Sequence, residues 1–108
     1  MTPRITTAIQ VSALVRRVNA EGGAATVLRK GDETAGSILL LLAEKGRISA
    51  IYEPALTIDG SYAWRKVTIQ NVDNKEELAD SIYRRQCRDP DLWVVELDIA
   101  HPERFIAD

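Results

Sequence analysis

The sequence predicts an α+β fold in which a mixed, mostly antiparallel sheet of about five strands carries one helix on each face. Segments with helical or strand periodicity follow one another in the order α-β-β-β-β-α-β. The run Ile38–Leu42 is apolar at every position. A strand whose residues do not alternate between apolar and polar is buried on both faces. Burying both faces requires a layer on each side, which gives a three-layer α/β/α arrangement. The alternative places both helices on one face of an antiparallel sheet.

The first half of the chain supplies one helix and three strands. A helix is expected from Thr6 or Thr7 to about Glu21, because apolar residues recur on one stripe at Val11, Leu14, Val15 and Val18. The pair Gly22–Gly23 ends this helix. Strands are then expected at residues 24–30, 37–43 and 48–53, with Pro54 closing the third strand.

The second half supplies a strand, a helix and a strand. The turn Asp59–Gly60 leads into a strand at about residues 61–70. Asp73 or Asn74 caps a helix that ends before Pro90, and a strand follows at residues 92–98. The inner stripe of this helix is expected to hold Leu78, Ala79 and Ile82, extended by Tyr83. Short loops favour a meander of the first four strands, and the second helix allows a parallel fifth strand.

Length and composition indicate one cytoplasmic domain. The 108 residues are typical of a single domain, 1–108, with flexible or loosely packed ends expected at 1–6 and 100–108. Cys87 is the single cysteine, so an intramolecular disulfide is excluded. The longest apolar stretch, Ile38–Ala43, is far shorter than the ~20 residues that cross a bilayer, so no membrane association is expected. A net charge of −2 argues against a dedicated DNA-binding domain.

Clustered arginines are the candidate ligand-binding residues. They end the two helices and the first strand, and converging ends would form a cationic face for phosphate, carboxylate or an acidic partner: Arg16, Arg17, Arg29, Arg84, Arg85 and Arg88. The alternative is ordinary helix decoration through the pairs Asp80–Arg84 and Arg17–Glu21. Trp64, beside Arg65 and Lys66, is a candidate recognition residue or a packing residue.

An acidic group near the C-terminus is the candidate metal site. Glu96 and Asp98 share a strand face, and Asp91 precedes them, so together they offer oxygen ligands for Mg²⁺. The segment with Pro90-Asp91 followed by Val94-Val95-Glu96-Leu97 resembles the motif of nucleases of the PD-(D/E)xK type. Those enzymes have a lysine two residues after the acidic residue, and this chain has Asp98 at that position. The alternative is that Asp89 and Asp91 frame the turn at Pro90.

Other chemistries find little support. A zinc site is nearly excluded by one cysteine and one histidine. The loop Gly31–Gly36 has the glycine spacing of a phosphate loop but lacks the following Lys-Ser/Thr, so we expect a tight connection with glycines at positive φ. Cys87 is expected to be a semi-buried helix residue, the alternative being a thiol activated by nearby arginines. No cofactor is expected.

Three stretches carry a family resemblance. They are Val11–Arg17, Gly22–Asp32 continued by Ala35–Leu39, and Arg84–Arg85 followed by Asp89-Pro-Asp-Leu-Trp-Val-Val-Glu96. Together they resemble a small family of bacterial proteins known as domain of unknown function 1491. The resemblance spans nearly the whole chain and implies a stand-alone bacterial protein. It implies no activity, so no site residue is carried over.

The sequence alone therefore leaves the biochemical function unknown. It favours a non-enzymatic binding or interaction module, with an unidentified protein partner or a second copy of itself. The first alternative is binding of a polyanion, either nucleic acid or a phosphorylated ligand, through the arginines. The second is a metal-assisted hydrolase that uses Asp91, Glu96 and Asp98. No catalytic residue is assigned.

Overall fold

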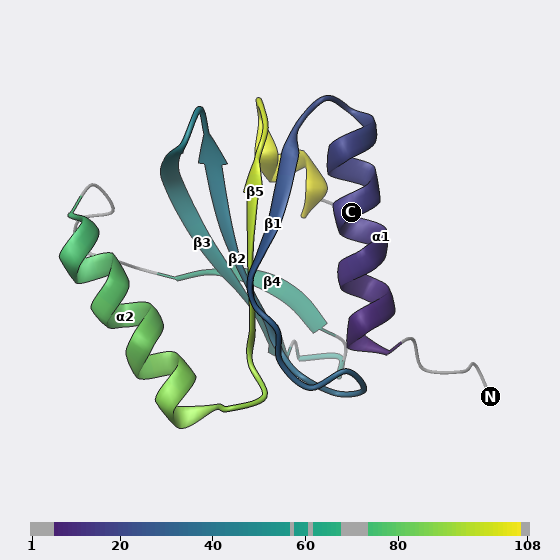
Figure 1. The fold of residues 1–108 in the computed structure, drawn as a ribbon. Helices are drawn as coiled ribbons and strands as arrows, with labels where there is room; N and C mark the ends of the chain where they lie inside the picture. The colour runs from purple at the N-terminus through teal and green to yellow at the C-terminus, as the bar shows by residue number, and fades with distance from the viewer. Residues whose placement is uncertain (1–5, 57, 61, 68–73, 107–108) are drawn as a thin grey trace.

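The computed structural model describes residues 6–56, 58–60, 62–67 and 74–106. Its elements follow the predicted order (Figure 1): α1 (Thr7–Ala20), β1 (Ala24–Arg29), β2 (Ile38–Glu44), β3 (Arg47–Leu56), β4 (Tyr62–Lys66), α2 (Lys75–Arg88), β5 (Trp93–Asp98) and the short 3₁₀ helix η1 (Pro102–Phe105). Two parts of the sequence predictions lie outside the described residues. They are the two ends of the chain, 1–5 and 107–108, and residues 68–73, which include the predicted end of the fourth strand and the candidate cap Asp73.

Both helices begin at a side-chain cap. The hydroxyl of Thr6 accepts a hydrogen bond from the amide of Ile9, and the side-chain oxygen of Asn74 accepts from the amides of Glu76 and Glu77. These bonds satisfy donors that the first helical turn leaves unpaired. In addition, the backbone carbonyls of Thr34 and Glu33 in a loop accept hydrogen bonds from the first two amides of α1. No helix in the described residues is both long and apolar enough to span a membrane.

The five strands form one mixed sheet in the order β1-β5-β2-β3-β4. β5 runs parallel to β2, as expected for a strand that follows a crossover helix, and the other pairs are antiparallel. The predicted meander holds only for β2, β3 and β4. It is wrong for β1, because β5 lies between β1 and β2 and separates them.

The sheet is covered on both faces, which confirms the three-layer arrangement (Figure 1). The even-numbered leucines of β2 and the odd-numbered residues of β5 join Val11 and Val18 of α1 in one core. The odd-numbered residues Leu39 and Leu41 join Val94 and Leu78 of α2 in a second core. Each side of the central strands therefore packs against a different helix.

The helix α2 covers its face less completely than the sequence predicts. Leu78 is buried and Ile82 is half-buried, but Ala79 is exposed and Tyr83 is 67% exposed, so these two do not extend the inner stripe. Figure 1 shows α2 on the opposite side of the sheet from α1. The helix is anchored by few apolar contacts, and most of its surface faces solvent.

The predicted end of the third strand is wrong for a physical reason. Pro54 does not close β3, which continues to Leu56. Beyond Tyr52 this strand pairs only with β4, and proline is tolerated where one side of a strand has no partner.

The described part of the C-terminal segment, residues 100–106, is packed against the domain, whereas a flexible or loosely packed end was expected there. Pro102 and Phe105 of η1 are buried against the α1-side core, and Phe105 lies under the guanidinium groups of Arg17 and Arg104.

The loop of residues 31–36 is a packed connection, but its glycines serve a different purpose from the predicted one. Neither Gly31 nor Gly36 has positive φ. Instead, a Cβ at Gly31 would lie 2.0 Å from the backbone oxygen of Asp91, and one at Gly36 would lie 2.3 Å from it. The loop is further held by the indole nitrogen of Trp93, which donates to the carbonyl of Asp32 over 2.7 Å. Close backbone approach is therefore what requires glycine here.

Candidate functional site

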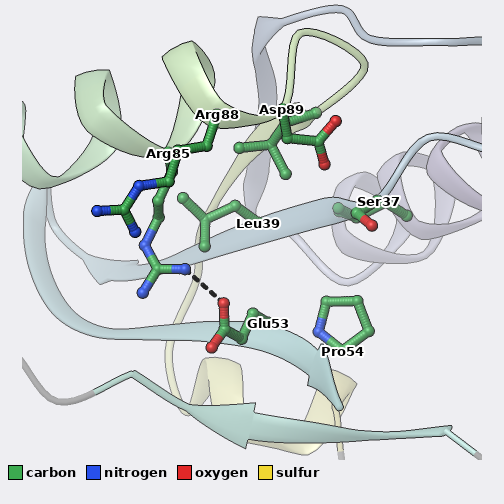
Figure 2. Close-up of a pocket in the computed structure, with 9 residues that line it drawn as sticks. Ser37, Leu39, Glu53, Pro54, Arg85, Arg88 and Asp89 are labelled. Carbon is green, nitrogen blue, oxygen red and sulfur yellow. Dashed lines mark hydrogen bonds and ion pairs between the residues drawn. The ribbon is translucent and has the colours of Figure 1, made fainter. Parts of the chain in front are cut away.

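A pocket of about 210 Å³ opens between the C-terminal end of α2 and the central strands. We call it the arginine pocket; it is lined by Ser37, Ile38, Leu39, Glu53, Pro54, Arg85, Arg88, Asp89 and Leu92 (Figure 2). Its apolar floor consists of buried residues, and its rim carries the charged side chains. An apolar cavity with a few converging polar groups is the usual form of a small-ligand site.

Glu53 organises the charges of this pocket. Its carboxylate forms ion pairs with Arg65, at 2.6 Å, and with Arg85. Burial raises the pKa of Glu53, but the hydrogen bonds and charges of Arg65 and Arg85 together outweigh burial, so its pKa lies below the ordinary value. Glu53 is thus ionised at neutral pH and fixes the guanidinium group of Arg85 at the pocket wall. Figure 2 shows Arg85 reaching down from α2 to this carboxylate.

Arg88 is the second cation of the pocket. It is the last residue of α2, its side chain is exposed, and it forms no ion pair with any residue that the structure describes. The neighbouring Asp89 is engaged locally, since its carboxylate accepts the amide of Asp91 over 3.1 Å. The guanidinium group of Arg88 is therefore available to a ligand.

The remaining candidate arginines lie elsewhere. Arg16 and Arg17 belong to α1, on the opposite face of the sheet, and Arg29 ends the edge strand β1. Arg84 donates to the backbone carbonyl of Asp80. Arg17 lies over Phe105, while Glu21, its predicted partner, pairs with Arg104. Of the six arginines, Arg85 and Arg88 line the arginine pocket, and the other four do not.

Trp64 serves packing. It is half-buried against the α1-side core, while its neighbour Arg65 pairs with Glu53. Cys87 differs from the expectation of a semi-buried residue, because its side chain is exposed on α2. Its hydrogen bond with Tyr83 raises the pKa of that exposed phenol.

The three acidic candidates do not gather at one point, although Glu96 and Asp98 share a face of β5 as predicted. Asp91 precedes β5 and Asp98 ends it, so a strand length of roughly 20 Å separates them. The carboxylate of Asp98 accepts the amides of Lys45 and Gly46, at 2.8 and 2.7 Å, and thereby closes the β2–β3 turn. Among the described residues no three His, Cys, Asp or Glu side chains gather as metal ligands. The metal-assisted reaction therefore gains no support from this geometry.

Sequence reasoning missed the acidic partner of the pocket. Glu53 follows Tyr52 in a strand and belongs to no motif, so only the pairing of β3 with β4, which sets it opposite Arg65, indicates its role. Ser37 and Pro54 were likewise not predicted as site residues. Ser37 reaches the pocket because β2 and β5 pair in parallel, which sets Ser37 beside the start of β5. Pro54 belongs to β3, the other neighbour of β2.

Comparisons with known proteins identify a family to which this chain is similar, and the description of that family names no activity. The model of the family described as "Protein of unknown function (DUF1491)" matches residues 5–107. A crystal structure of a DUF1491 family protein from Caulobacter crescentus CB15 is 30% identical, with 97% of each chain covered and a TM-score of 0.83. An NMR structure of a DUF1491 family protein from the same organism is also 30% identical, with 99% of this chain and 96% of that chain covered and a TM-score of 0.81.

A third similar structure is the solution structure of protein Atu0922 from A. tumefaciens. It is 31% identical over 96% of this chain and 93% of that chain, with a TM-score of 0.73. No curated protein matches the chain. The similarity therefore extends over almost the entire fold, and no matched name specifies a ligand or a reaction.

Proposed function

This chain belongs to the DUF1491 family of proteins of unknown function, and we propose that it is a binding module that takes a small anionic group in the arginine pocket. The observation that carries the proposal is that one guanidinium group in the pocket is held in place by an ion pair, while a second one in the same pocket is free. Arg85 is held by Glu53, whereas Arg88 has no ion-pair partner among the described residues. The proposal places the protein in the cytoplasm, in keeping with its single cysteine.

The charge of the pocket supports an anion as its ligand. Two guanidinium groups and two carboxylates line the pocket, those of Arg85, Arg88, Glu53 and Asp89. Arg65 lies outside the lining but shares Glu53 with Arg85, so with Arg65 counted the guanidinium groups around the pocket outnumber the carboxylates by one. Guanidinium groups also present several donors in one plane, which suits the oxygens of a phosphate or carboxylate.

The size and surroundings of the pocket support a small ligand. A volume of about 210 Å³ is below the 300–1,000 Å³ typical of drug-sized sites. The floor at Leu39 and Leu92 is apolar, so it fits a short carbon chain attached to the anionic group. Nucleic acid is less well supported, because the described arginines are divided between the two faces of the sheet.

The position of the pocket makes its affinity depend on side chains. It lies at the C-terminal end of α2, where the helix dipole is negative and repels an anion. Backbone amides of a helix N-terminus, which hold phosphate in many proteins, are therefore not the donors here. Binding relies on the arginines, so their removal and added salt both weaken it.

The test is a titration of the full chain with inorganic phosphate, pyrophosphate or succinate, followed by amide NMR shifts. The proposal predicts shifts at Ser37 and residues 85–89 that weaken as salt is added. Arg88→Gln should lower the affinity by roughly tenfold or more, the equivalent of one lost charge-assisted hydrogen bond.

The matched control is Arg16→Gln, which removes the same charge from an exposed arginine on the opposite face. This variant should bind as the wild type does. Equal losses in the two variants, or shifts that bypass the pocket for all three anions, would contradict the proposal. A response to succinate but not to phosphates would identify a carboxylate ligand, which the proposal includes.

A further inference from the structure

We propose that the open edge of β1 pairs with β1 of a second copy of this chain, forming an antiparallel, two-fold symmetric dimer. The proposal is independent of the arginine pocket, which lies on the α2 side of the sheet. Figure 1 shows β1 at the near edge of the sheet, with the two helices to either side and no described element in front of it. Within the sheet, β1 pairs only with β5.

The exposure of β1 sets it apart from protected edges. Five of its six residues are exposed, including Val27 at 41% and Leu28 at 52%. Its charge is confined to the final position, Arg29. The opposite edge strand, β4, carries exposed Arg65 and Lys66, and charged side chains are a common device against edge pairing. β1 lacks this device along Ala24–Leu28.

Backbone geometry shows which groups of β1 point outward. The amides of Trp93 and Ile99 donate to carbonyls of the segment containing β2, so the even-numbered residues of β5 face β1. Ala24 and Thr26 are opposite Asp98 and Glu96, and these pairs therefore exchange the hydrogen bonds between the strands. The backbone groups of Ala25 and Val27, which alternate with them, point to the open edge.

These outward groups define the register of the dimer. Ala25 of one copy pairs with Val27 of the second copy, and Val27 with Ala25, which gives four backbone hydrogen bonds in the two-fold arrangement. Thr26 then lies opposite its own symmetry mate in a non-hydrogen-bonded pair, and threonine pairs across strands are favourable. The bulge between Val27 and Arg29 ends the ladder.

Charge supports the antiparallel direction. Arg29 is the one charged residue of β1, and Glu21, before the turn at the other end of the strand, is already paired with Arg104. Antiparallel pairing places the two Arg29 side chains at opposite ends of the ladder, where they do not repel each other. A parallel arrangement would instead place the two Arg29 side chains at the same end. A second copy is therefore the partner whose chemistry this edge fits.

Cysteine cross-linking tests the register. Opposite residues of a non-hydrogen-bonded pair have Cα atoms about 4.5 Å apart, within the range of a disulfide. The variant Thr26→Cys with Cys87→Ser should therefore form a covalent dimer on mild oxidation. The matched control, Ala63→Cys with Cys87→Ser, places a thiol on the exposed edge strand β4 and should remain monomeric.

Sedimentation equilibrium over increasing protein concentration tests the interface without cross-links. The wild type should rise in mass toward the dimer, whereas Thr26→Lys, which sets two lysines opposite each other, should raise the dissociation constant by several-fold. The monomer should tolerate this lysine, because position 26 is exposed and pairs with Glu96. Ala63→Lys should leave the mass unchanged. A wild type that stays monomeric, or equal cross-linking at positions 26 and 63, would overturn the proposal.

Discussion

Replacing Gly31 with alanine tests how tightly the β1–β2 loop is packed. The added Cβ would lie 2.0 Å from the backbone oxygen of Asp91, whereas ordinary contacts begin at 3.4 Å. Because the obstructing atom belongs to the backbone, no side-chain rotation relieves the clash. The same oxygen accepts the amide of Asp32 over 3.0 Å, and the carbonyl of Asp32 accepts the indole of Trp93. Moving the loop away therefore disturbs both hydrogen bonds.

The expected cost follows from these two effects. Forcing an extra methyl group into a packed site costs ~1–3 kcal/mol. Each disturbed hydrogen bond adds ~1 kcal/mol. We therefore expect Gly31→Ala to lower the free energy of unfolding by about 3 kcal/mol. For a domain of this size, that corresponds to a fall in Tm of roughly 10 °C or more.

Urea and thermal unfolding, followed by circular dichroism and by the fluorescence of the tryptophans, measure this cost. Gly22→Ala is the control, because its Cβ meets nothing within 4 Å and only its φ of +90° is unfavourable. That backbone strain costs ~1–2 kcal/mol. A Gly31→Ala variant at least as stable as Gly22→Ala would refute the argument from close approach.

Three further substitutions test the packing and charge of the fold. Phe105→Ala should lower the free energy of unfolding in urea by ~3–5 kcal/mol, since η1 closes the α1-side core; a loss below ~1 kcal/mol would mean that this segment is loosely packed. Glu53 has a lowered pKa, so its stabilisation is complete above the ordinary value of 4.5 and is lost as pH falls through the folded-state pKa. Unfolding free energies measured across this acid range should therefore depend less on pH in Glu53→Gln, and an unchanged slope would contradict the ion-pair assignment. Asn74→Ala should cost ~1 kcal/mol by thermal unfolding through loss of the α2 cap, whereas a neutral result would show that the cap is dispensable.

The fold was predictable where local signals agree with tertiary structure. The unbroken apolar run Ile38–Leu42 predicts a strand covered on both faces, and the structure places it against α1 and α2. Pairing was less predictable. Nothing local to Ala24–Arg29 indicates that β5 separates it from β2, because the order of strands depends on contacts between distant segments.

The candidate site was predictable only in part. Charge clustering pointed to Arg85 and Arg88, and the structure places both in one pocket. The same signal pointed to Arg16 and Arg17, which face the other way, because the sequence does not show on which side of the sheet a helix packs. Glu53 was missed because its importance comes from strand pairing, which leaves no local trace.

The position of β5 also affects how the protein is made. Its central place in the sheet means that β1 has no strand to pair with until almost the entire chain has left the ribosome. During synthesis only the β2–β4 meander can form from neighbouring segments, and chains fold from the N-terminal end as they emerge. We expect a chain that stops before Leu92 to lack cooperative urea unfolding, since both cores lose their central strand. The nascent protein would therefore depend on chaperones, or on quick completion, to shield the apolar residues of β2.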